Sequence, residues 1–92
     1  MKRLHIVISG RVQGVAFRAA TREKARVLNL TGWVRNLKDG RVEAVLEGED
    51  DKVDLMRHWC EHGPPLAMVT GVDATDEYYA GEFRDFTILY VK

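Results

Sequence analysis

The chain has 92 residues, of which 46% are hydrophobic, and this is enough for one compact domain with a single core. The formal net charge is zero at pH 7, so the composition offers no general attraction to nucleic acid or to an acidic membrane. One cysteine excludes an intramolecular disulfide, and no apolar stretch is long enough to span a bilayer. We therefore expect a single domain over residues 1–92, cytoplasmic and, by default, monomeric.

The first third of the chain predicts a strand, a loop and a helix. Apolar and polar side chains alternate along residues 4–9, which is typical of a strand with one buried face. Residues 10–17 contain two glycines and no helical period, so a loop is expected there. A helical period then runs from Arg18 to Leu28, and Asn29 should end the helix because asparagine tolerates a positive φ.

The middle of the chain predicts a hairpin followed by a second helix. Residues 31–37 and 41–47 read as strands, and the Asp-Gly pair between them is a strong tight-turn signal. In the second of these strands one face is expected to be buried. The helix should be capped by Asp50 or Asp51 and should end before Gly63-Pro64-Pro65.

The last third predicts two more strands. The first is expected over residues 68–72, followed by a polar loop that contains Asp73, Asp76 and Glu77. The second is expected over residues 86–90. Two helices on one face of an antiparallel sheet would bury all the apolar faces of these elements. The predicted fold class is therefore α+β, a ferredoxin-like split βαβ sandwich of order βαββαβ with a short extra strand.

The segment from Gly10 to Arg18 leads from the first strand into the first helix. The first N–H groups of a helix have no partner within it, and the helix dipole adds positive potential there, so an anion binds readily at such a place. Arg18 lies in the first turn, where a cation opposes the dipole at a cost of about 0.3–1 kcal/mol. An anion held between the guanidinium and the amides would reverse that cost. The alternative is a solvated surface arginine, and the spacing alone does not decide.

Asn36 is the second unusual residue, because asparagine is disfavoured within strands. One interpretation is a turn-flanking residue that bonds its own backbone beside the Asp-Gly turn. The other is a carboxamide that both donates and accepts hydrogen bonds and so orients a water molecule. Taken by itself, the pattern favours the first interpretation.

Two long segments carry a much more specific pattern. They are Ile8-Ser9-Gly10-Arg11-Val12-Gln13-Gly14-Val15-Ala16-Phe17-Arg18 and Gly32-Trp33-Val34-Arg35-Asn36-Leu37-Lys38-Asp39-Gly40-Arg41-Val42. Both resemble, in order and separation, the two signatures of the acylphosphatase family. Trp59, Gly63-Pro64 and Phe86 also fit the layout of that family, so the resemblance covers almost the whole chain.

The resemblance implies a ferredoxin-like fold and the hydrolysis of acyl phosphates to carboxylate and inorganic phosphate, without metal or cofactor. It implies that Arg18 binds the phosphoryl group and that Asn36 orients the attacking water. The supporting backbone amides are those of Gln13, Gly14, Val15, Ala16, Phe17 and Arg18. No strong general base is evident, so the substrate phosphate is expected to take the water proton, as is proposed for the family. Asn29 departs from the glycine that relatives often carry there, which should affect the helix end and not catalysis.

The sequence argues against three other functions. Cys60 is not followed by the arginine that a cysteine phosphatase needs, and it reads as a buried structural thiol. Residues 58–62 match a His-x-x-Glu-His zinc pattern, but the helix ends at once and no third ligand is evident. An RNA-recognition module needs aromatic side chains on its central strands, which residues 4–8 and 41–48 lack. The open alternative is a non-catalytic domain that senses an anion or metabolite.

Overall fold

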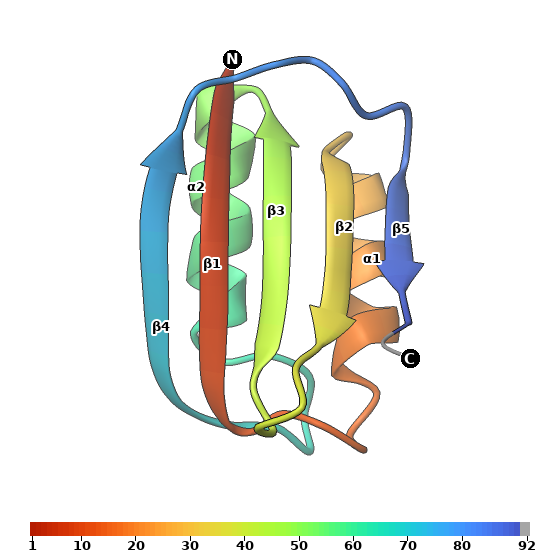
Figure 1. The fold of residues 1–92 in the computed structure, drawn as a ribbon, viewed down its shortest axis with the longest axis vertical. Coiled ribbons are helices and arrows are strands. Elements are labelled where there is room, and N and C mark those ends of the chain that lie inside the picture. Colours follow the sequence, from red (N-terminus) through yellow and green to blue (C-terminus); the bar gives the residue numbers. More distant parts are fainter. Residues whose placement is uncertain (91–92) are drawn as a thin grey trace.

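The protein folds as a five-stranded sheet covered on one face by two helices (Figure 1). The computed structural model describes residues 1–90. The elements are β1 (Lys2–Arg11), α1 (Phe17–Val27), β2 (Thr31–Asn36), β3 (Val42–Gly48), α2 (Asp50–Cys60), β4 (Met68–Glu77) and β5 (Phe86–Leu89). The strand order across the sheet is β4-β1-β3-β2-β5. The expected ferredoxin-like α+β arrangement is confirmed.

The core lies between the sheet and the helices, and it follows the two periodicities of the sequence. Every second residue of β1 faces the helices, and each helix contributes one apolar stripe. The buried side chains include Leu4, Ile6, Ile8, Phe17, Thr21, Ala25, Val34, Val42, Ala44, Leu46, Val53, Met56, Cys60 and Phe86. This core fixes α1 against β2 and β5 and so determines where the start of that helix lies.

Two expectations about the sheet were wrong in detail. The sheet is mixed, and not purely antiparallel, because β5 pairs with β2 in parallel. Residues 73–77, expected to be a polar loop, continue β4 as far as Glu77 and pair with β1. β4 is an edge strand whose side chains are mostly exposed. Its backbone pairs with β1 although its sequence lacks the alternation of apolar and polar residues that predicts a strand.

Several element ends also differ from expectation. β1 continues through a bulge at Ser9 and Gly10 to Arg11, so the loop begins two residues later. α1 starts at Phe17, one residue early. The N-cap of α2 is Glu49, without a side-chain capping bond, and Asp50 and Asp51 lie in the first turn. β5 ends at Leu89, and Asn29 has the expected positive φ of 57°.

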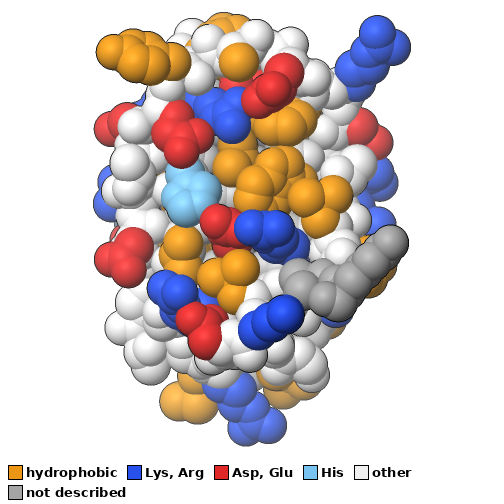
Figure 2. Space-filling model, in the orientation of Figure 1, with side chains coloured by type: hydrophobic (Ala, Val, Ile, Leu, Met, Phe, Trp, Pro, Cys, Tyr) orange, Lys and Arg blue, Asp and Glu red, His pale blue; other side chains and the backbone are white. Residues whose placement is uncertain are grey.

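The face of the sheet opposite the helices carries a mixture of hydrophobic and charged side chains (Figure 2). Glu43, on the middle strand β3, accepts hydrogen bonds from Arg35 at 2.6 Å and from His5 at 2.7 Å. His5 is half-buried in this position.

One end of this outer face is closed by the crossing segment, residues 78–85, which leads from β4 to β5 (Figure 1). The N–H of Ala80 donates to Glu47 at 2.9 Å, and Arg3 binds both Glu77 and Glu82. Glu47 is only 1% exposed, so both faces of β3 are buried at this end, where one was expected. Within residues 1–90, neither helix is long and apolar enough to cross a membrane.

Candidate active site

The two segments singled out in the sequence meet at one edge of the sheet. β1, β2 and β5 run in the same direction, because β1 and β2 are each antiparallel to β3 and β5 is parallel to β2. Their carboxyl ends therefore lie at the same edge, where α1 also begins (Figure 1). This topology brings the loop after β1 close to Asn36, the last residue of β2.

The loop that enters α1 presents a set of free backbone donors. Among residues 1–90, no acceptor is bonded to the N–H groups of residues 13–19, and the first backbone bond of the helix is Ala20 N–H to Ala16 O at 3.0 Å. Gly14 and Ala16 both have positive φ, 73° and 61°. Alternation of left- and right-handed conformations turns successive N–H groups toward one side and forms an anion-binding concavity. Neither a side-chain cap nor an acidic residue occupies the first turn.

Gln13 fastens this loop to the turn beside Asn36. Its side-chain Nε2 donates to the carbonyl oxygens of Leu37 at 2.7 Å and Arg41 at 2.9 Å. Leu37 and Arg41 also close the β2–β3 turn, with a backbone bond of 2.8 Å. One carboxamide thus links the segment that carries the free N–H groups to the hairpin that carries Asn36.

Arg18 lies in the first turn of α1 and is half-buried. Among residues 1–90 it forms no ion pair and no hydrogen bond, and the ring centroid of Tyr90 lies 5.3 Å from the central carbon of its guanidinium. Tyr90 follows β5, whose Leu89 is in register with Arg35, the residue before Asn36. The contact therefore places Arg18 at the same edge of the sheet as Asn36.

The carboxamide of Asn36 has a buried oxygen that no described residue satisfies. The turn beside it is closed by another side chain, since Asp39 accepts the backbone N–H of Arg41 at 3.1 Å. Asn36 therefore does not make the turn-flanking bond that was the simpler interpretation of the sequence. The turn therefore does not use this carboxamide, and in this structure its oxygen is closed off from solvent.

Two contacts at this edge were not expected from the sequence. Gln13 was expected to contribute only its backbone amide, and Tyr90 was expected only as the last residue of the final strand. The bridging role of Gln13 depends on which carbonyls come within reach of it, and that is a property of the folded turn. The contact of Tyr90 depends on the parallel pairing of β5, which the local sequence pattern does not predict.

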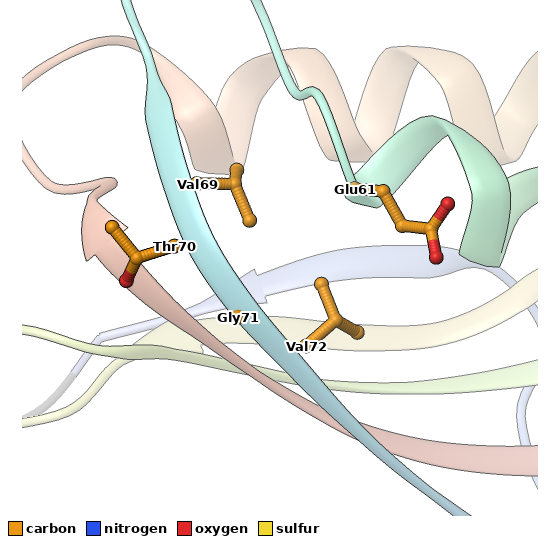
Figure 3. A pocket seen from close by; sticks show the side chains of 5 residues that line it. All are labelled: Glu61, Val69, Thr70, Gly71 and Val72. Carbon is orange, nitrogen blue, oxygen red and sulfur yellow. The ribbon is translucent and has the colours of Figure 1, made fainter.

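A pocket elsewhere on the molecule does not have this character. A pocket between the end of α2 and β4 is lined by Glu61, Val69, Thr70, Gly71 and Val72 (Figure 3). Its single charged group is a carboxylate, which suits no anion.

The thiol and the histidines near the end of α2 carry little chemistry. Burial raises the pKa of the Cys60 thiol to about 12, so the nucleophilic thiolate is disfavoured. The rings of His58 and His62 are 6.3 Å apart between centroids, and His58 lies 3.3 Å from Glu61. The described part of the chain has no group of three or more His, Cys, Asp or Glu that could hold a metal ion.

Comparison with known proteins agrees with the resemblance of the two segments. The family model described as Acylphosphatase matches residues 4–88. An acylphosphatase of Methylococcus capsulatus is 55% identical over 97% of both chains, and one of Acaryochloris marina is 58% identical over 94% of this chain and 91% of its own. The crystal structure of an acylphosphatase from Bacillus subtilis has a TM-score of 0.94 at 34% identity and covers 98% of this chain and 100% of its own. The chain therefore belongs to the acylphosphatase family of hydrolases.

Proposed function

We propose that the protein hydrolyses the carboxyl–phosphate anhydride of acyl phosphates, with Arg18 and the loop amides binding the phosphoryl group and Asn36 orienting the attacking water. The observation that carries this proposal is the row of N–H groups over residues 13–19 that have no acceptor among residues 1–90, beside an arginine that has no acidic partner in the same range. No metal or cofactor is required for these roles.

The binding step follows from charge and geometry. A phosphoryl group carries two negative charges and offers acceptor oxygens on three sides. The amides of residues 13–18 and the positive end of the α1 dipole supply donors and potential from one side. The guanidinium of Arg18 supplies two parallel donors from another, a geometry that suits phosphate. The cost of a cation in the first turn of a helix then becomes a gain when the substrate is bound.

The chemical step needs positioning more than strong acid–base groups. A water held by the Asn36 carboxamide attacks phosphorus, and the bond from phosphorus to the acyl oxygen breaks. The bonding electrons leave with the carboxylate, and the two protons of the water end on the phosphate, which departs as H₂PO₄⁻. The carboxylate is a good leaving group, so alignment and electrostatic stabilisation are sufficient. We propose that the phosphate itself accepts the water proton.

The test separates binding from turnover. We expect Arg18→Ala to abolish hydrolysis of benzoyl phosphate and also the stabilisation of the fold by inorganic phosphate. In the unsubstituted protein that stabilisation should be about 2.7 kcal/mol at a phosphate concentration 100 times Kd. Asn36→Ala should keep this stabilisation and lower kcat by about a hundredfold or more, because it removes a group that acts on the water.

Arg84→Ala is the matched control, since Arg84 is exposed in the crossing segment at the opposite edge of the sheet. It should behave as the unsubstituted protein. Unaltered rates in Arg18→Ala and Asn36→Ala would refute the assignment of both residues. Faster hydrolysis of an ordinary phosphate ester than of acetyl or benzoyl phosphate would refute the substrate class.

The second candidate is a domain that binds an anion or metabolite without turnover. It would use Arg18 and the loop amides and would have no need of Asn36. No described residue bonds the carboxamide oxygen of Asn36, and this favours the hydrolase, which uses that carboxamide. Release of phosphate from acetyl phosphate in excess of the protein concentration would decide for the enzyme, and binding without release for the sensor.

We further propose that the protein acts as a cytoplasmic monomer. Its one cysteine, Cys60, is buried and available to no disulfide. Light scattering at micromolar protein concentration should return the mass of one chain, and a stable dimer would contradict the proposal.

A further inference from the structure

We propose that Tyr90 is a positioning residue for Arg18, with the face of its ring holding the guanidinium in the orientation that receives the phosphoryl group. This inference rests on the proposed function of Arg18. It concerns how the arginine is held in the absence of a salt bridge or hydrogen bond from the described residues.

The contact has the geometry of a cation–π interaction. The distance of 5.3 Å from the guanidinium carbon to the ring centroid is within the range of about 6 Å in which such pairs attract. An arginine side chain has many rotamers, and a half-buried one without partners would sample them at an entropic cost to binding. The ring restricts the side chain before the substrate arrives.

A ring suits this task better than a carboxylate would. A carboxylate partner would occupy two guanidinium N–H groups and would repel the dianionic substrate. An aromatic face attracts the cation and leaves all five N–H donors available to phosphate. This explains why an arginine meant for an anion is paired with an aromatic ring.

The placement of Tyr90 is not explained by core packing. The residue is 73% exposed, whereas Phe86, four residues earlier, is 0% exposed and belongs to the core. Tyr90 reaches Arg18 because β5 is held in register beside β2, with Leu89 opposite Arg35. The short parallel strand β5 thus places the exposed ring of Tyr90 at the edge of the sheet where α1 begins.

The experiment compares Tyr90→Leu, which removes the ring, with Tyr90→Phe, which keeps it. The readouts are the inhibition constant of inorganic phosphate and kcat/KM for two substrates, acetyl phosphate and benzoyl phosphate. Tyr90→Leu should weaken phosphate binding about two- to fivefold and lower kcat/KM by a similar factor for both substrates. Tyr90→Phe should retain most of the phosphate affinity.

Tyr78→Leu is the matched control, since Tyr78 is 97% exposed at the far end of β4. It should leave phosphate inhibition unchanged, and Tyr90→Leu should unfold at the same temperature as the unsubstituted protein.

Three results would overturn the inference. Unchanged phosphate binding in Tyr90→Leu would show that the ring does not act on Arg18. An equal loss in Tyr90→Phe would assign the effect to the hydroxyl group. A loss confined to benzoyl phosphate would mean that the ring contacts the acyl group. In each case an inactive Arg18→Ala variant would still support the proposed function. An active Arg18→Ala variant would contradict both the proposed function and the role of Tyr90.

Discussion

Gln13 shows how one side chain can set the distance between two functional segments. Its carboxamide spans the β1–α1 loop and the β2–β3 turn through two hydrogen bonds, at 2.7 Å and 2.9 Å. The free amides and Asn36 belong to different elements, so their separation depends on this link and on the sheet. Because both hydrogen bonds come from one carboxamide, a change in the conformation of the loop would have to break two bonds at once.

We expect Gln13→Leu to lose both hydrogen bonds and leave two turn carbonyls without a donor. The free energy of unfolding should fall by about 1–3 kcal/mol, and kcat/KM should fall further than this loss of folded protein accounts for. Urea denaturation and hydrolysis of benzoyl phosphate check the two effects. If Gln13→Leu lowers the free energy of unfolding but leaves kcat/KM unaltered, Gln13 supports the turn and has no part in placing the site.

At the level of single residues, the sequence predicted backbone conformation better than side-chain contacts. Arg18 and Asn36 drew attention because a cation at a helix start and an asparagine in a strand are both locally unfavourable. Their roles came from the resemblance of the two segments, and these roles stay predictions. The positive φ of Asn29 followed from the intrinsic tolerance of asparagine, and it is confirmed. The partners of Gln13 and Tyr90 were not predictable, because each lies in a segment that only the completed sheet brings near.

Among the elements, β2 is the most constrained by its neighbours. Gly32 has a φ of 137°, and a Cβ at this position would collide with the carbonyl oxygen of Val45 on β3. The ring of Phe86 on β5 lies on the same side, 3.4 Å from such a Cβ. Only glycine lets β2 sit between β3 and β5 at this point.

We expect Gly32→Ala to lower the free energy of unfolding by about 3 kcal/mol or more, from steric overlap and an unfavourable φ together. Gly71→Ala is the matched control within β4, because a Cβ there meets nothing within 4 Å. It should change stability by less than about 1 kcal/mol. Thermal and urea unfolding of both variants measure these changes. Equal losses of stability at the two positions would contradict the steric explanation.

The elements that the sequence predicted well are those with a regular apolar period. β1, β3 and both helices follow the periodicity of their apolar residues, although their ends shift by one or two residues. The second half of β4 was missed because an exposed edge strand needs no apolar alternation. The parallel pairing of β5 was missed because topology is decided by long-range packing.

For the molecule as a whole, acidic and basic side chains are balanced at fourteen each, and some of them form ion pairs between neighbouring strands of the sheet. One cluster of these ion pairs on the outer face centres on the half-buried Glu43. Burial opposes ionisation of this carboxyl, but the hydrogen bonds from His5 and Arg35 outweigh it, so the pKa of Glu43 is lowered from its ordinary 4.5. A lowered pKa means that the ionised group favours the folded state.

The contribution of Glu43 to stability should therefore be complete above about pH 4.5 and be lost as the pH falls through the lower pKa of the folded state. We expect Glu43→Gln to reduce stability at pH 7 and to flatten its decline in acid. Urea unfolding between pH 7 and pH 3 tests this. Glu23→Gln, at an exposed site on α1, should leave the profile unchanged, and a Glu43→Gln profile as steep as the original would contradict the explanation.

The position of β1 between β3 and β4 has a consequence for how the protein is made. The first strand to leave the ribosome obtains its second neighbour only when Glu77 has emerged, about 65 residues later. At 5–20 residues per second this leaves roughly 3–13 s in which one side of β1 is an unpaired edge in the nascent chain. The same wait applies to any fragment cut short before β4, which would carry an exposed, apolar strand open to pairing with other molecules.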